Sequence, residues 1–321
     1  MPTFQPPILL PRRVAVTVAA TLPARRYGAW LLLTLSSCLW AGNSTIGRAL
    51  RDESGAIELS FWRWTVASLC LLPLLGREVW EKRALVRRHL PLFLAMAFTS
   101  GAPNNFLVFY GLHYTTALHT QLFNSTIPVW VMLLSWAVLR TPLSRGELAG
   151  LAVSMAGVLA IVAEGEIGRL LALQVNFGDL IVLGALFFWS VYMLLLKYRP
   201  AELSSSAFVL VVGGLSSFMM VPAWLWQVAH GGRLLPTEPG VIGGILYLSI
   251  ASSLFAGVIH SIGVQRIGPA RASLFTHLVP VFGAVFSALL IGEAFHLYHA
   301  AGFAMVLAGL WIANRTHPRY T

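Results

Sequence analysis

Apolar runs follow one another along almost the whole chain and are separated by short polar or turn-forming segments. We predict helices over residues 28–48, 57–75, 91–111, 115–139, 145–163, 178–197, 205–227, 240–262, 268–291 and 294–314. Each run is close to the length of about 20 residues that a helix needs to cross the hydrocarbon core of a bilayer. The pattern therefore predicts an all-α integral membrane protein with ten transmembrane helices.

The second half of this pattern repeats the first. Residues 111–161 align without a gap onto 263–313, a shift of 152 positions, and eleven of the fifty-one aligned positions are identical. The identities include Gly111 with Gly263, Pro128 with Pro280, Gly150 with Gly302, and Gly157 with Gly309. Trp40 and Trp189 also correspond, so each half holds five spans. Because five is an odd number, residues 28–163 and 178–314 are expected to be inverted repeats, an arrangement typical of secondary transporters.

The basic residues predict an orientation for these spans. With the N-terminus in the cytoplasm, the inner segments hold seventeen Lys and Arg residues and the outer segments hold four. Positive charge is enriched in cytoplasmic loops. We therefore expect a multi-pass protein of the cell inner membrane with two cytoplasmic tails, 1–27 and 315–321.

Composition narrows the class further. The chain is 57% hydrophobic and only 11% charged, against about 25% charged residues in soluble proteins. Its net charge of +10 is scattered between apolar runs, which argues against nucleic-acid binding. Cys38 and Cys70 lie within apolar runs, so no disulfide framework is expected. No nucleotide loop or metal cluster is evident, and we expect no cofactor.

Polar residues share one helix face in the fourth and ninth spans. They are Gln121, Asn124 and Ser125, with Ser273, Thr276 and His277 at the same repeat positions. Polar groups in a bilayer need partners or water, so both faces should point inward. Pro128 and Pro280 each remove one backbone hydrogen bond nearby. The faces line a central substrate cavity in one interpretation, and form packing contacts between helices in the other.

A second candidate group contains the paired tryptophans Trp40 and Trp189, each near the middle of a span. Asn43 and Tyr192 lie one turn further along and could add polar contacts. Two facing indoles could bind a planar or cationic substrate, although ordinary core filling explains them equally well. Asn104 follows in the third span, next to Asn105, and we expect at most one of these two to face the cavity squarely.

Ionisable groups are scarce inside the spans. Arg63 is the one basic residue embedded in a span away from its ends, about two turns from the outer end of the second span, and we expect its side chain to extend to the membrane surface, with anion binding as the alternative. No Asp or Glu lies in mid-span. A proton-coupled carrier would therefore depend on histidine, His277 first and then His260. Uncoupled facilitation is equally compatible with the sequence.

The sequence resembles the EamA-type permeases of the drug/metabolite transporter superfamily. The resemblance rests on Leu39-Trp40-Ala41-Gly42-Asn43, on Tyr110-Gly111 through Ala117 leading to Pro128, on Gly150 to Gly157, on Gly178-Asp179-Leu180, and on Gly292-Glu293 after Pro280. This chain has Thr141 where the family usually has a second glutamate.

The resemblance implies a central cavity and efflux of an amino acid or related small metabolite. The sequence itself offers no catalytic constellation for the rival class, a membrane-embedded enzyme, and a channel is a third possibility. The expected partners are a small-molecule substrate and the lipid bilayer. Small-residue pairs such as Gly150 and Gly157 predict either helix packing or a homodimer face.

Overall fold

The computed structural model describes residues 27–50, 53–115, 117–166, 168, 174–291 and 296–315. Both expected tails, apart from Tyr27 and Arg315, lie outside these residues, as do Gly292 and Glu293. Within the described ranges the chain is helical and contains no strand. The all-α fold class is confirmed.

The first half begins with a helix at Tyr27–Trp40. It continues with α2 (Gly42–Ala49), α3 (Ala56–Glu81), α4 (Arg83–Arg88), α5 (Leu90–Ser100), α6 (Ala102–Gly111), α7 (Ala117–Asn124), α8 (Ile127–Leu139) and α9 (Arg145–Val162). The short helix α4 follows α3 directly and carries basic residues. The pairs α5/α6 and α7/α8 are single predicted spans that a break divides.

The second half contains α11 (Phe177–Leu195) with the 3₁₀ turn η1 (Leu196–Tyr198), then α12 (Ser205–Ala229) and α13 (Pro239–Leu246). A π-helical segment, η2 (Tyr247–Phe255), joins α13 to α14 (Ala256–Ile267). The chain ends with α15 (Pro269–Ser273), η3 (Leu274–His277), α16 (Leu278–Ile291) and α17 (Leu297–Arg315).

Grouped in chain order, these helices occupy the ten predicted spans. Within the described residues, eight of these spans are helices long and apolar enough to cross a membrane. The first span is broken after Trp40 and the ninth after Ser273. Breaks fall where backbone chemistry requires them: α6 starts after Gly101 with a proline in its first turn, and α8 starts with Pro128 in its first turn. Proline is tolerated there because the first N–H groups of a helix have no partner within the helix.

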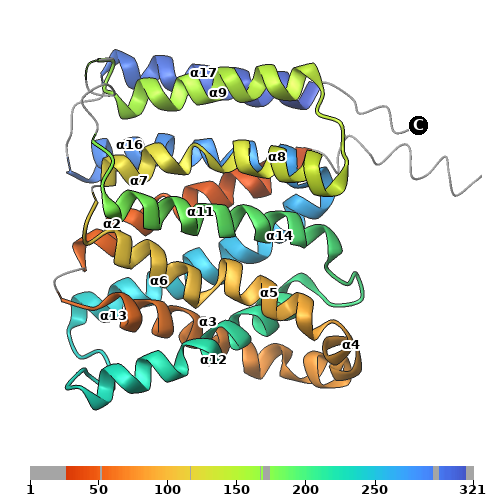
Figure 1. Cartoon of the computed structure of the whole chain (residues 1–321), viewed down its shortest axis with the longest axis vertical. Helices are drawn as coiled ribbons and strands as arrows, with labels where there is room; N and C mark the ends of the chain where they lie inside the picture. Colours follow the sequence, from red (N-terminus) through yellow and green to blue (C-terminus); the bar gives the residue numbers. More distant parts are fainter. Residues whose placement is uncertain are drawn as a thin grey trace, which may run out of the picture.

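The helices lie roughly parallel, with α9 and α17 side by side at one edge of the molecule and α3 and α12 together at the other (Figure 1). Glycines bring α9 and α17 into backbone contact. A Cβ atom on Gly150 would lie 2.5 Å from the carbonyl oxygen of Gly309, and one on Gly157 would lie 2.6 Å from that of Gly302. These small residues pack within the chain, which favours the helix-packing interpretation of the pattern.

Pairs of residues 152 positions apart, the shift of the repeat, contact each other across the two halves. The hydroxyl groups of Thr65 and Ser217, which are 152 positions apart, share a hydrogen bond. His277 Nε2 is 3.0 Å from the carbonyl oxygen of Ser125, again 152 positions away. Contact between equivalent positions is what a two-fold relation between the halves produces, because such positions meet only at the axis.

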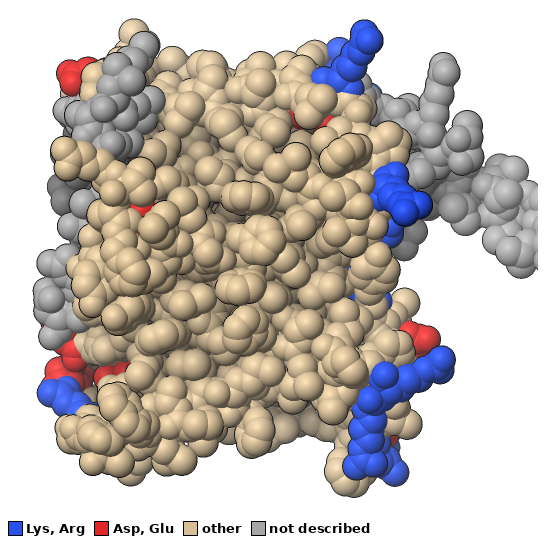
Figure 2. Space-filling model, viewed as in Figure 1, with Lys and Arg blue, Asp and Glu red and all other residues tan. Residues whose placement is uncertain are grey.

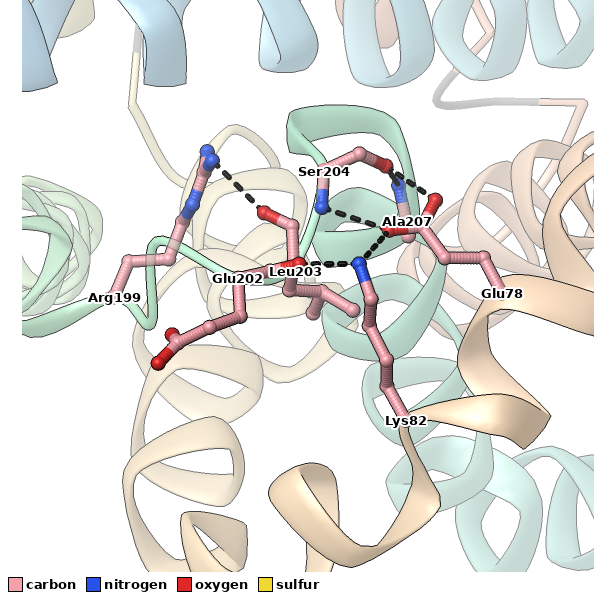
Figure 3. A network of polar contacts seen from close by, with 7 residues as sticks. All are labelled: Glu78, Lys82, Arg199, Glu202, Leu203, Ser204 and Ala207. Carbon is pink, nitrogen blue, oxygen red and sulfur yellow. Dashed lines mark hydrogen bonds and ion pairs between the residues drawn. The ribbon is translucent and has the colours of Figure 1, made fainter.

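Basic side chains gather at one end of the helices, the end where α4 lies (Figure 2). There the two halves are joined by polar contacts. The backbone N–H of Ser204 donates to Glu78 Oε1 at 2.9 Å, and its hydroxyl donates to Glu78 Oε2 at 2.7 Å. Lys82 pairs with Glu78 at 2.8 Å and also donates to the carbonyl of Glu202 (Figure 3). Arg271 and Glu147 form a second contact between the halves, a buried ion pair at 3.0 Å.

Candidate functional site

A cavity of about 150 Å³ lies between the two halves of the molecule. Its lining comes from the first four spans and from the sixth to the ninth. The wall is mostly apolar, but its polar members come from both repeats: Asn43, Arg63, Ser100, Asn104, Asn105, Thr120, Asn124, Tyr192, Ser252, Ser253 and Thr276. A largely apolar pocket with a few convergent polar groups is the usual form of a small-molecule site.

The predicted tryptophan pair lies together in this wall. The rings of Trp40 and Trp189 are 5.3 Å apart and nearly perpendicular, at 83°. This edge-to-face geometry is a favoured one for aromatic pairs. Trp40 Nε1 donates to the carbonyl oxygen of Ser252 at 3.0 Å, so its polar edge is satisfied. Tyr192 packs against Trp189, with ring centres 5.1 Å apart, and extends the aromatic surface.

The asparagines contribute amide groups to the same wall. Asn104 donates from Nδ2 to the carbonyl oxygen of Ala185 at 2.7 Å, and Asn105 Oδ1 accepts from Trp64 Nε1 at 2.8 Å. Both line the cavity, although their adjacency led us to expect only one. The carbonyl oxygen of the Asn43 side chain is buried and has no hydrogen-bond partner in the part of the chain that the structure describes. A bound solute could therefore donate to Asn43.

The polar residues predicted on the fourth and ninth spans have two different environments: some line the cavity and others are buried between spans. Asn124 and Thr276, which are repeat equivalents, both line the cavity. Their neighbours Ser125 and His277 do not. His277 is fully buried between spans, with Nδ1 2.8 Å from the Ser154 hydroxyl and Nε2 3.0 Å from the Ser125 carbonyl.

Ser273, another member of the face in the ninth span, does not reach the cavity. The Ser273 hydroxyl donates to its own helix at the carbonyl of Ala270, at 2.8 Å, and Ser273 is not part of the wall. The side chain of Gln121 lies outside the described residues.

His260 lies against the tryptophan pair. It is 2% exposed, its ring centre is 4.6 Å from that of Trp40 and 6.3 Å from that of Trp189, and neither ring nitrogen has a hydrogen-bond partner among the described residues. It therefore lies behind the tryptophan pair, one layer away from the cavity wall. Of the two histidines predicted as proton carriers, His260 is the one whose ring nitrogens are not already engaged.

Sequence reasoning missed several lining residues. Arg63 is 6% exposed and faces the cavity, instead of extending to the molecular surface as we expected. Ser252 and Ser253 lie in the π-helical segment η2 and were not singled out. Adjacent serines inside an apolar run were the available signal. π-helical turns are frequent at functional sites, but no sequence rule located this one.

The site is suited to binding rather than to covalent chemistry. Within the described residues, no group of three or more His, Cys, Asp or Glu side chains is placed to hold a metal ion. Among the described residues that form the cavity wall there is no Asp, Glu, Cys or His side chain. What the wall does supply is an aromatic surface, amide and hydroxyl groups, and one guanidinium, from two inverted halves. These features are typical of the solute site of a membrane transporter built from two repeats.

Comparison with known proteins places the chain in a family. The model of the EamA-like transporter family matches residues 28–163 and again 176–315. The chain belongs to the EamA-like transporter family, with one copy of the family unit in each half. The expected resemblance is thus confirmed.

Individual relatives agree with this assignment. An uncharacterized transporter of Archaeoglobus fulgidus is 29% identical over 292 residues, which cover 88% of this chain and 96% of that protein. A probable terminal-alkyne amino-acid exporter of Streptantibioticus cattleyicolor is 26% identical over 285 residues, covering 88% and 92%. A protein of known crystal structure shares the fold with a TM-score of 0.69 at 16% identity, over 90% of this chain and 97% of that one.

Proposed function

We propose that this transporter exports a small amino-acid-like solute across the cell inner membrane by alternating access, with both termini in the cytoplasm. The carrying observation is the central cavity, to which equivalent positions of the two inverted repeats contribute: Trp40 with Trp189, and Asn124 with Thr276. Inverted halves around one site can open it to either side by moving against each other. A relative named as an amino-acid exporter supports the substrate class and the direction.

The two ends of the molecule fit this cycle. At the basic end, Glu78 and Ser204 join the halves, and so do Glu147 and Arg271. These contacts must break for the site to open at that end. The abundance of Lys and Arg at the same end (Figure 2) favours its cytoplasmic placement, because cytoplasmic loops retain positive charge.

The test is counterflow in proteoliposomes that contain the purified full chain. Vesicles are loaded with an unlabelled aromatic amino acid, and uptake of the labelled compound is followed with no other driving force. A carrier gives transient, saturable accumulation of label, whereas a channel gives simple equilibration. Flux that neither saturates nor shows counterflow across a panel of amino acids would contradict the proposal.

Two tryptophan variants provide the matched control. Trp189→Leu removes an indole from the cavity wall and should reduce counterflow severalfold. Trp136→Leu changes an indole that is 61% exposed on the outside of the bundle, where it faces the surrounding detergent or lipid. Equal loss in both variants would show that the tryptophan pair has no special part in transport.

A further inference from the structure

A charged side chain without a counter-ion lies in the cavity wall. Arg63, in α3, is 6% exposed and lines the cavity. Its Nε–H donates to the Ser253 hydroxyl at 2.6 Å, and Nη2–H donates to the Ser252 hydroxyl at 2.9 Å. Within the described residues, no carboxylate forms an ion pair with it. A guanidinium has five N–H donors, so the two serines leave Nη1 and one N–H of Nη2 available.

Burying the guanidinium of Arg63 costs free energy unless an anion binds to it. Removing a cation from water is unfavourable when no opposite charge accompanies it. Two neutral hydroxyl groups accept hydrogen bonds but supply no negative charge. The two hydrogen bonds hold the guanidinium inside the molecule, against η2. Ser252 and Ser253 thus hold the positive charge of Arg63 at the wall of the cavity.

Ser252 also binds Trp40, which belongs to the aromatic part of the site. Ser252 accepts from Arg63 through its hydroxyl and from Trp40 Nε1 through its carbonyl oxygen, at 2.9 and 3.0 Å. The cationic group and the tryptophan pair therefore meet at one residue of the π-helical segment. A solute that touches both would need an anionic group next to an apolar or planar body.

We propose that Arg63 is the residue that selects solutes carrying a carboxylate, and that it binds this group while the body of the solute lies against Trp40 and Trp189. The inference rests on the proposed transport function and names its substrate class. Guanidinium matches a carboxylate through two parallel N–H···O bonds, which an ammonium cannot reproduce. The unpartnered amide oxygen of Asn43 accepts from an amino group on the same solute.

The experiment compares solutes that differ only in the carboxylate. Binding of tryptophan, tryptophanamide and tryptamine to the purified full chain is measured by calorimetry near pH 7. Wild type should bind tryptophan about tenfold to hundredfold more tightly than either analogue, the usual range for a hydrogen-bonded charged group. Arg63→Gln should abolish this preference, and Arg63→Lys should retain part of it because charge remains while the fork is lost.

A second buried arginine provides the control. Arg199 is also bonded to serine hydroxyls, Ser205 at 2.9 Å and Ser261 at 2.7 Å, but it does not line the cavity. Arg199→Gln should leave the ratio of the tryptophan and tryptamine affinities unchanged, even if it lowers stability. Because the readout is a ratio, a general loss of folded protein does not imitate the expected result. Where Arg63→Gln does not fold, Arg63→Lys alone decides.

Several outcomes would overturn the inference. Wild type that binds tryptamine as well as tryptophan, or binds none of the three, rules out a carboxylate site of this kind. An unchanged ratio in Arg63→Gln assigns the selectivity to other residues. Competition by millimolar chloride or phosphate, as effective as that by tryptophan, would make Arg63 an inorganic-anion site. Counterflow separates this failure from that of the transport proposal: solute flux that ignores Arg63 refutes only the inference, and absence of counterflow for every amino acid refutes the function.

Discussion

Replacing Gly150 by alanine should destabilise the protein, because α9 and α17 are in backbone contact there. A Cβ at this position would lie 2.5 Å from the carbonyl oxygen of Gly309 and 2.6 Å from the Cβ of Ala313. Non-bonded carbon atoms prefer separations of about 3.5–4.0 Å, so the helices would have to move apart by about 1 Å. The neighbours are backbone and a methyl carbon, neither of which can rotate away.

The expected loss can be bounded. Overpacking of this kind costs about 1–3 kcal/mol of unfolding free energy. The control is Gly184→Ala in α11, where no atom lies within 4 Å of an added Cβ. Alanine there avoids the entropic cost of glycine in a helix, about 0.5–1 kcal/mol. Gly150 lies in a helix too and gains the same amount, so the two variants should differ in unfolding free energy by the overpacking cost alone, about 1–3 kcal/mol.

The assay is unfolding of the purified protein in mixed micelles by titration with SDS, followed by tryptophan fluorescence. The double variant Gly150→Ala/Gly309→Ala adds a test of the geometry. Both changes demand the same separation of α9 and α17, so the second should cost less than it does alone. If Gly150→Ala were as stable as Gly184→Ala, the close contact between these helices would be wrong, and strict additivity would place the two glycines at independent contacts.

Three further outcomes are expected. Asn124→Ala should reduce counterflow severalfold while the melting temperature stays near that of wild type, because a polar contact in a membrane protein contributes only about 0.6 kcal/mol to folding; unchanged flux would move the solute site elsewhere. Glu147→Gln should lower the unfolding free energy by about 3–5 kcal/mol because it removes the buried carboxylate that pairs with Arg271, and SDS titration measures this; a loss below about 1 kcal/mol would mean that the pair is solvated. If histidine carries a coupling proton, His260→Gln should abolish flux driven by an imposed pH gradient, whereas His277→Gln should mainly lower stability by disturbing two hydrogen bonds; wild-type flux that ignores the gradient ends the coupling hypothesis for both.

Much of the fold follows from local pattern. Run length fixes the spans, because a helix must be about 20 residues long to cross the bilayer core. The repeat of Pro128 as Pro280 and of Gly150 as Gly302 indicated two related halves, and an odd number of spans in each half requires inversion. Proline positions also located the breaks in the fourth and ninth spans, since a missing N–H acts within one turn of its own residue.

The face of a helix that meets the cavity was not determined in this way. Asn124 and Ser125 are neighbours on a polar face, as are Thr276 and His277, and successive helix residues differ in direction by about 100°. The structure turns the first of each pair into the cavity and the second into the contact between spans. Periodicity identifies a polar face, but only the packing of neighbouring helices decides which edge of that face remains open.

Arg63 shows the same division most clearly. Its sequence position, inside an apolar span, is compatible with a side chain that extends to the surface or with one that turns inward. The inward direction depends on Ser252 and Ser253, which are about 190 residues away in the chain and reach it through a π-helical turn. Sequence alone thus determined the spans, their repeat and the type of residue available, because these depend on local chemistry. Tertiary structure decided which polar groups share one cavity, because that depends on contacts between segments that no local pattern relates.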